Sequence, residues 1–153
     1  MVEDGNEAPD FEVATSGGGT LSLSKLKGKA VVLYFYPKDN TSGCTTEAKD
    51  FSGLAADFKA AGAHIIGISP DSAASHDKFC RKHDLRLELG ADEHHAVATA
   101  YGVWVEKSMY GKKYMGVERS TFLIDKTGKV AKSWRKVKVP GHAKEVLAAC
   151  IEL

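Results

Sequence analysis

Residues 30–36, Ala-Val-Val-Leu-Tyr-Phe-Tyr, form an unbroken apolar run that limits the possible folds more than any other stretch of the chain. The run is rich in β-branched and aromatic side chains, and it therefore predicts a strand that is covered on both faces. Pro37 ends this run. From about residue 42 to residue 61, apolar side chains recur at helical spacing, and Gly62 follows as a C-terminal stop. A buried strand thus leads into a helix through a short loop.

The rest of the chain also predicts strands and helices. Two brief strands are expected around the Gly17-Gly18-Gly19 turn, and a buried strand at 64–69 is followed by a helix from about 70 to 83. A shorter helix at 93–101 and a turn at 111–113 between extended residues come next. Strands at 120–125 and 129–137, joined by a turn, precede a last helix after Pro140-Gly141. The close spacing of the two late strands makes them antiparallel.

This order of elements predicts an α/β fold with a central sheet of mixed direction, helices on both faces and extra strands at the N-terminus. A thioredoxin-like fold meets that description. The chain has 153 residues and a mass of 16.5 kDa, which suits a single domain spanning residues 1–153.

Composition narrows the possible partners. The 21 Lys and Arg residues nearly balance the 20 Asp and Glu residues, so the net charge of +1 gives no global field for nucleic acid or an anionic membrane. The sequence has no apolar stretch long enough to span a bilayer and no pattern of a secretion signal at its start, so a cytoplasmic location is expected. In that compartment, cysteines are more often catalytic than structural. Cys44, Cys80 and Cys150 cannot all pair within a monomer.

Cys44 lies in the first turn of the predicted helix, just after the buried strand. Thr41 and Ser42 are candidates for the N-cap of this helix. Unpaired backbone N–H groups and the helix dipole favour an anion at this position, so the Cys44 thiol should ionise more readily than a free cysteine. The alternative is that Cys44 is a small buried residue beside an ordinary cap.

The residues around Cys44 carry a resemblance to a known family. The pattern of Pro37, Thr41 and Cys44 resembles the Pro-x-x-x-Thr/Ser-x-x-Cys signature of peroxiredoxins. The strings at residues 35–41 and 43–48 more narrowly resemble the peroxiredoxin Q, or bacterioferritin comigratory protein, subfamily, whose later motifs are matched by residues 110–116 and 119–125. The similarity extends from Ala8 to the last predicted strand.

This resemblance implies a thiol peroxidase without a metal or other cofactor. The Cys44 thiolate would attack a hydroperoxide and become a sulfenic acid. Arg119, at the start of a predicted strand, would stabilise the charge on sulfur and on the departing oxygen. Thr41 would hydrogen-bond the peroxide, and Pro37 would shield the sulfur from water. The family also implies a monomer that is recycled by thioredoxin or a similar dithiol reductant.

The resemblance also bears on the second cysteine. Many members of the subfamily carry it five residues after the first, where this chain has Lys49. In another arrangement it lies on the following helix, and Cys80 fits that arrangement. A disulfide needs Cα atoms about 4.4 to 6.8 Å apart, so the two helices are expected to unfold locally when Cys44 and Cys80 pair. Cys150 lies on the apolar stripe of the last helix and is expected to serve packing.

Three alternatives remain open. Without a suitable partner, Cys44 could belong to a one-cysteine peroxidase resolved by an external thiol. Its oxidation could instead serve as a signal in a peroxide-sensing or chaperone-like protein. Cys80, His83, His94 and His95 include possible metal ligands, but their spacing is a weak signal for a metal site.

Overall fold

The computed structural model describes residues 2–153, and in this part of the chain a seven-stranded sheet is accompanied by a two-stranded hairpin. The large sheet has the strand order β2-β1-β5-β4-β3-β8-β9. Its strands are β1 (Glu12–Thr15), β2 (Thr20–Ser22), β3 (Ala30–Phe35), β4 (Ala63–Ser69), β5 (Glu88–Ala91), β8 (Ser120–Ile124) and β9 (Val130–Trp134), and the hairpin consists of β6 (Trp104–Met109) and β7 (Lys112–Val117).

Strand β3 lies in the middle of the sheet and has every residue buried, as its apolar run predicts. It pairs in parallel with β4 and antiparallel with β8, so the sheet is mixed. Successive side chains of a strand point to opposite faces, and β3 therefore contributes to two cores. Val31, Leu33 and Phe35 belong to one core, and Val32 and Tyr34 belong to the other.

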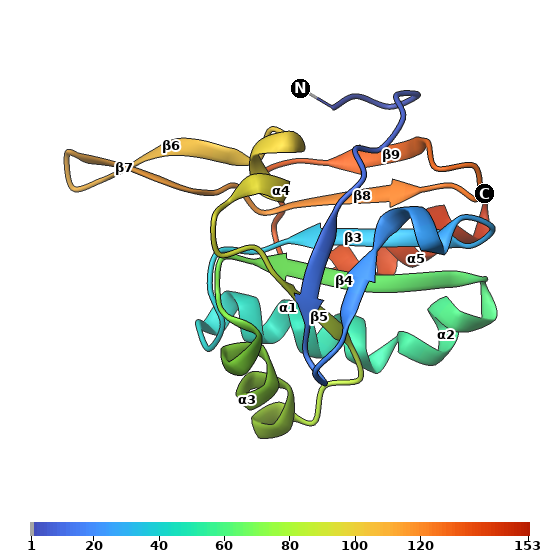
Figure 1. Cartoon of the computed structure of the whole chain (residues 1–153), viewed down its shortest axis with the longest axis horizontal. Helices are drawn as coiled ribbons and strands as arrows, with labels where there is room; N and C mark the ends of the chain where they lie inside the picture. Colours follow the sequence, from blue (N-terminus) through green and yellow to red (C-terminus); the bar gives the residue numbers. More distant parts are fainter. Residues whose placement is uncertain (1) are drawn as a thin grey trace.

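Helices cover both faces of the sheet (Figure 1). The core that contains Val32 and Tyr34 lies under four helices, α1 (Ser42–Gly53), α2 (Ala55–Ala60), α3 (Ala73–His83) and α5 (His142–Ile151). The opposite core lies under α4 (Ala96–Ala100), the 3-10 turn η1 (Leu23–Leu26) and the segment before β1. The predicted α/β fold, a mixed sheet with helices on both faces and extra N-terminal strands, is confirmed.

The structure corrects the sequence prediction at several places. The predicted continuous helix at 42–61 is wrong, because Leu54 leaves the helical conformation and separates α1 from α2 just after Gly53, a weak helix former. Helix α3 begins after Ser72, whose hydroxyl accepts a hydrogen bond from the Ser75 amide and caps it. Strand β5, which sequence analysis missed, pairs with β4 and β1.

The hairpin of β6 and β7 extends away from the body of the molecule (Figure 1). Its turn is at Tyr110 and Gly111, both of which have positive φ, so Lys112 and Lys113 belong to β7 rather than to the turn. Two consecutive residues with positive φ are typical of the tight type I′ hairpin turn.

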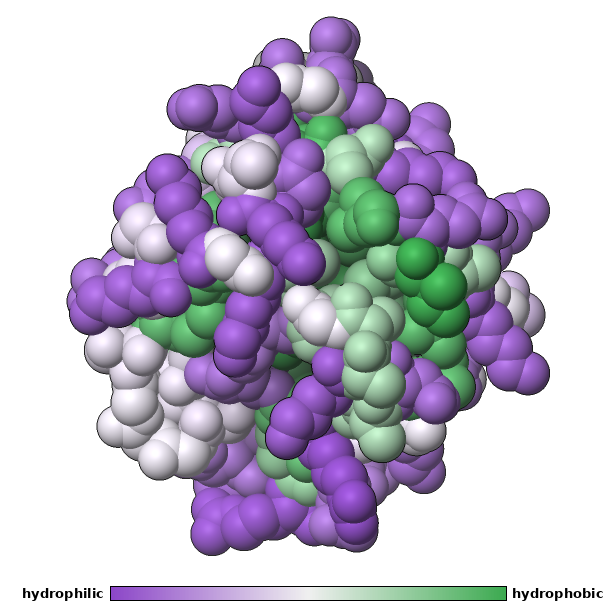
Figure 2. Space-filling model, turned by 90° about the vertical axis from the view of Figure 1, so that its right-hand side faces the viewer, coloured by the Kyte–Doolittle hydropathy of each residue, from purple (hydrophilic) through white to green (hydrophobic). Residues whose placement is uncertain are grey.

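Helix α5 closes the other end of the molecule. Leu147, Ile151 and Leu153 line a shallow groove between α5 and α2, and Figure 2 shows apolar surface on this side. Cys150 is buried beneath the groove, and burial raises the pKa of its thiol. Within residues 2–153, no helix combines the length and the apolar character needed to cross a membrane.

Candidate active site

The position of Cys44 follows from the connection between β3 and α1. The chain leaves the buried end of β3, turns through residues 36–41 and enters α1, so Cys44 lies in the first helical turn. Thr41 occupies the N-cap position, but its hydroxyl donates to the carbonyl of Lys38 (2.9 Å) and does not cap the helix. The amides of the first turn are therefore free of a side-chain cap. Their partial positive charge lies at the end of the helix that holds Cys44, a residue that is only 2% exposed.

Arg119 contacts this sulfur directly. It lies in the short connection between β7 and β8, and the pairing of Ser120 with Phe35 brings that connection to the end of β3. One guanidinium nitrogen of Arg119, Nη2, donates a hydrogen bond to Cys44 Sγ at 3.2 Å. The guanidinium also passes close to Gly43, where a Cβ atom would lie 3.4 Å from the same nitrogen, at the limit of ordinary van der Waals contact.

Glu47 holds the other side of the guanidinium. Arg119 Nη1 donates to Glu47 Oε1 at 2.6 Å, and the Glu47 side chain is almost completely buried. Burial raises the pKa of Glu47 to about 7, and the charge of Arg119 opposes that rise. Burial alone would lower the pKa of Arg119, but Glu47 and Cys44 together raise it. Arg119 is therefore a permanent cation shared between a carboxyl group and the sulfur.

Glu47 is a site residue that the sequence pattern alone does not predict. Its position three residues after Cys44 was the available signal, because residues three apart lie on the same face of a helix. The pattern could not show that both side chains meet one guanidinium, since Arg119 comes from a distant strand connection.

Glu47→Gln is expected to remove part of the pH dependence of stability. A carboxyl group whose pKa rises from 4.5 to about 7 on folding binds its proton more tightly in the folded chain. Its contribution to the free energy of unfolding is thus full below pH 4.5 and is lost as the pH rises to about 7. The loss is at most about 3 kcal/mol. Urea unfolding of the wild type and Glu47→Gln at about pH 5 and about pH 8 measures this change in the free energy of unfolding. An equal change with pH in the two proteins would contradict the raised pKa of Glu47.

The other predicted site residues lie in two places. Pro37 is half-buried in the loop that leads from β3 to Thr41 and Cys44. Cys80 is on α3, half-buried, with its thiol turned toward the carbonyl of Leu87 at 4.0 Å. Burial raises the pKa of the Cys80 thiol. All three cysteines are free, so Cys44 and Cys80 are not joined in this state.

Possible metal ligands do not gather around the cysteines or elsewhere in the described chain. Residues 2–153 contain no group of three or more His, Cys, Asp or Glu side chains placed to hold a metal ion. His95, one of the weak candidates, stacks on Trp104 with ring centroids 3.7 Å apart.

A mixed sheet that presents a cysteine in a first helical turn against a partly buried arginine defines a thiol-dependent redox protein of thioredoxin-like fold. The model of the AhpC/TSA family matches residues 5–133. The chain is 53% identical to peroxiredoxin Bcp of Bacillus subtilis, covering 95% of this chain and 93% of that protein. It is 50% identical to peroxiredoxin Bcp of Xanthomonas campestris, covering 92% and 88%.

Solved structures agree with these relatives. Peroxiredoxin Q of X. campestris superposes with a TM-score of 0.90 at 47% identity, covering 98% of this chain and 95% of that one. A second structure, of the X. campestris bacterioferritin comigratory protein studied for alkyl peroxide reduction, has a TM-score of 0.90 at 46% identity, covering 98% and 96%. The chain belongs to the AhpC/TSA family and, within it, to the peroxiredoxin Q or bacterioferritin comigratory protein subfamily. Family membership supports an enzyme of the thiol peroxidase class.

Proposed function

We propose that this chain reduces hydrogen peroxide and organic hydroperoxides through the thiolate of Cys44. The contact between Arg119 Nη2 and Cys44 Sγ supports this most directly, because it places a cation on the sulfur that would react. The thiolate attacks the hydroxyl oxygen of the peroxide, the O–O bond breaks, and the other oxygen takes a proton from solvent and leaves as water or an alcohol. Cys44 becomes a sulfenic acid. The relative studied for alkyl peroxide reduction makes organic hydroperoxides a reasonable substrate class here.

The neighbours of Cys44 have distinct roles in this proposal. Negative charge moves from sulfur to the departing oxygen, and Arg119 is placed to stabilise it throughout. The Thr41 hydroxyl, which donates to the Lys38 carbonyl, accepts a hydrogen bond from the peroxide, and Pro37 limits the access of water. Glu47 fixes the guanidinium so that Nη2 remains directed at the sulfur. Apart from the peroxide, these residues require no other reactant for the first step.

Cys80 completes the cycle in this proposal. Its thiol attacks the sulfenic sulfur of Cys44, a disulfide forms, and water leaves. The two residues lie on separate helices, and Cys44 is buried, so α1 and α3 must open locally before the sulfurs can meet. Thioredoxin or a similar dithiol then reduces the disulfide. A cytoplasmic location would supply that reductant.

Cys80→Ser tests this cycle. The variant should reduce the first equivalent of peroxide as fast as the wild type, because Cys44 and Arg119 are untouched. Its thioredoxin-linked steady-state rate should fall by about 100-fold or more, because the sulfenic acid has no internal partner. Stopped-flow kinetics measure the first step, and a thioredoxin-coupled assay measures turnover.

Mass spectrometry of the peroxide-treated wild type, after alkylation, provides the matching control. It should show a disulfide between Cys44 and Cys80 and leave Cys150 alkylated. Equal steady-state rates for wild type and Cys80→Ser would rule out Cys80 as the resolving cysteine and would favour an external thiol.

A further inference from the structure

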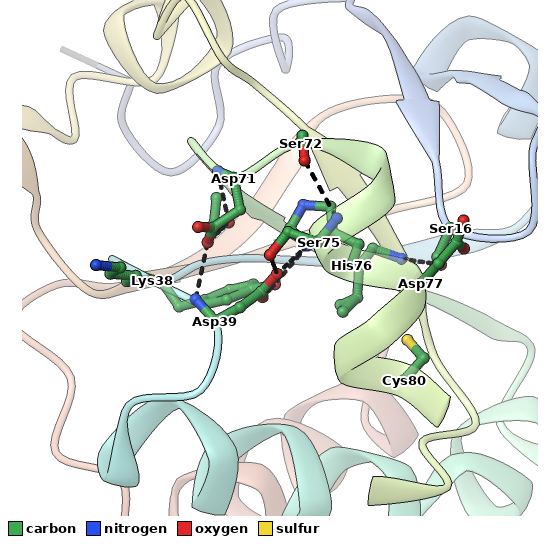
Figure 3. A network of polar contacts seen from close by, with 12 residues as sticks. Ser16, Lys38, Asp39, Asp71, Ser72, Ser75, His76, Asp77 and Cys80 are labelled. Carbon is green, nitrogen blue, oxygen red and sulfur yellow. Dashed lines mark hydrogen bonds and ion pairs between the residues drawn. The ribbon is translucent and has the colours of Figure 1, made fainter. Parts of the chain in front are cut away.

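A buried polar network joins the loop before Cys44 to the helix that carries Cys80 (Figure 3). Its centre is Asp39, which is 4% exposed and lies in the loop between β3 and α1. Asp39 Oδ2 lies 2.8 Å from His76 Nδ1 and accepts a hydrogen bond from the Ser75 hydroxyl at 2.8 Å. Asp39 Oδ1 accepts from the Tyr36 hydroxyl at 2.6 Å. Both His76 and Ser75 belong to α3.

The hydrogen bonds show the charges in this network. His76 Nε2 lies 3.0 Å from the carbonyl of Gly90, which can only accept, so Nε2 carries a proton. Burial alone would raise the pKa of Asp39, but hydrogen bonds from His76, Tyr36 and Ser75 lower it, so Asp39 is a carboxylate. His76 Nδ1 lies 2.8 Å from an oxygen of that carboxylate, which can only accept, so this contact assigns a proton to Nδ1 as well. Asp39 and His76 therefore form an ion pair whose side chains are 1% and 0% exposed.

A second contact holds the same loop from its other side. The backbone amide of Asp39 donates to Asp71 Oδ2 at 2.8 Å, just before α3 begins. Asp71 is itself fixed by the Ser69 hydroxyl, which donates to the same oxygen at 2.7 Å. The side chain of Asp39 thus binds the first turn of α3, and its backbone binds the connection that leads into that helix.

The network is placed so that it opposes disulfide formation. His76 lies one helical turn before Cys80 on α3, and Asp39 lies in the loop that leads into the first turn of α1, where Cys44 is found. By contrast, the thiol of Cys80 has a long contact with the Leu87 carbonyl, at 4.0 Å, and a hydrogen-bonding neighbour in Ser16, and neither contact is an ion pair. Helix α3 cannot leave its place against the active-site loop unless the buried ion pair is separated, which takes both His76 and Ser75 away from the Asp39 carboxylate.

We infer that the Asp39–His76 ion pair is a positioning device that holds α3 in place while Cys44 reacts, and that it sets the rate at which Cys80 reaches the sulfenic acid. This inference rests on the proposed role of Cys80. A slow release of α3 leaves the sulfenic acid available to a second hydroperoxide, which would oxidise it to a sulfinic acid and leave as water or an alcohol. The strength of the pair therefore also sets the sensitivity of the enzyme to over-oxidation.

Asp39→Asn tests the inference, because it removes the charge and nearly keeps the shape of the side chain. After one equivalent of hydrogen peroxide, formation of the disulfide between Cys44 and Cys80 should be about 10- to 100-fold faster than in the wild type. The peroxide concentration that produces sulfinic acid at Cys44 should rise by a similar factor. Acid quenching, alkylation and mass spectrometry measure both quantities.

Two further variants keep the test decisive. Ser75→Ala removes a single hydrogen bond to Asp39 and should accelerate disulfide formation by only a few fold, which gives a readout if Asp39→Asn does not fold. Val130→Ala is the matched control, because Val130 is buried in the core on the opposite face of the sheet. Val130→Ala should lower thermal stability without accelerating formation of the disulfide between Cys44 and Cys80. This control therefore distinguishes general destabilisation from release of α3.

The outcomes separate this inference from the proposed function. If the wild type forms no disulfide between Cys44 and Cys80, the proposed cycle fails, whatever the variants do. If the wild type forms it, but Asp39→Asn and Ser75→Ala form it at the wild-type rate or more slowly, then the positioning role of the ion pair is refuted and the cycle stands.

Discussion

Replacement of Cys44 by serine is expected to lower hydroperoxide turnover by about 10⁴-fold or more, which is the scale of loss when a catalytic nucleophile is removed. Serine nearly keeps the shape of the side chain that contacts Arg119. Its hydroxyl group, however, remains protonated near neutral pH and cannot take up the peroxide oxygen as sulfur does. Peroxide consumption in the presence of excess dithiothreitol measures the effect without dependence on any particular protein reductant.

Cys150→Ser is the matched control for this substitution. Cys150 lies on the buried face of α5, among core side chains, whereas the side-chain hydrogen bonds of Arg119 go to Glu47 and Cys44. This variant should lose some thermal stability and retain turnover. Sustained peroxide consumption by Cys44→Ser would refute the proposed nucleophile. A wild-type protein that oxidises Cys44 once but does not turn over would instead favour the sensing alternative.

The fold could be predicted to a large extent because its strongest signals are local. The apolar run of β3, the alternation of strands and helices, and the short connection between β8 and β9 each follow from neighbouring residues. The errors occur where local signals are weak. Strand β5 has only four residues and is identified by its pairing with β4 and β1, and the break at Leu54 interrupts an apolar pattern that continues on both sides of it.

The polar contacts around the site were much harder to predict. The place of Cys44 in a first turn follows from its distance to the end of a strand, which the sequence shows directly. Only the family motif predicts a role for Arg119, because no local pattern indicates that β8 pairs with β3 and brings the guanidinium to the sulfur. No local pattern predicts a role for Asp39 or His76. A buried ion pair between a loop and a helix depends on tertiary packing, and an aspartate alone is typical of an exposed position.

Arg119→Met is expected to slow the oxidation of Cys44 by about 10²- to 10³-fold, the usual cost of removing one group that stabilises charge in a transition state. Methionine fills much of the same space but supplies neither a donor nor a charge at 3.2 Å from the sulfur. The thiolate then loses its closest cation, so alkylation of Cys44 by iodoacetamide at neutral pH should also slow. Glu47 is left buried without its partner, and a fall in thermal stability is expected as well.

Two comparisons distinguish catalysis from this loss of stability. Arg135→Met removes a guanidinium of similar burial that binds the carbonyls of Tyr101 and Gly102, so it should destabilise the protein and leave the alkylation rate of Cys44 unchanged. Arg119→Lys keeps the charge but loses the fork that reaches Glu47 and the sulfur together, so its rate should lie between wild type and Arg119→Met. If Cys44 of Arg119→Met were oxidised and alkylated at the wild-type rate, the guanidinium would contribute nothing to the reaction. The helix terminus alone would then have to activate Cys44.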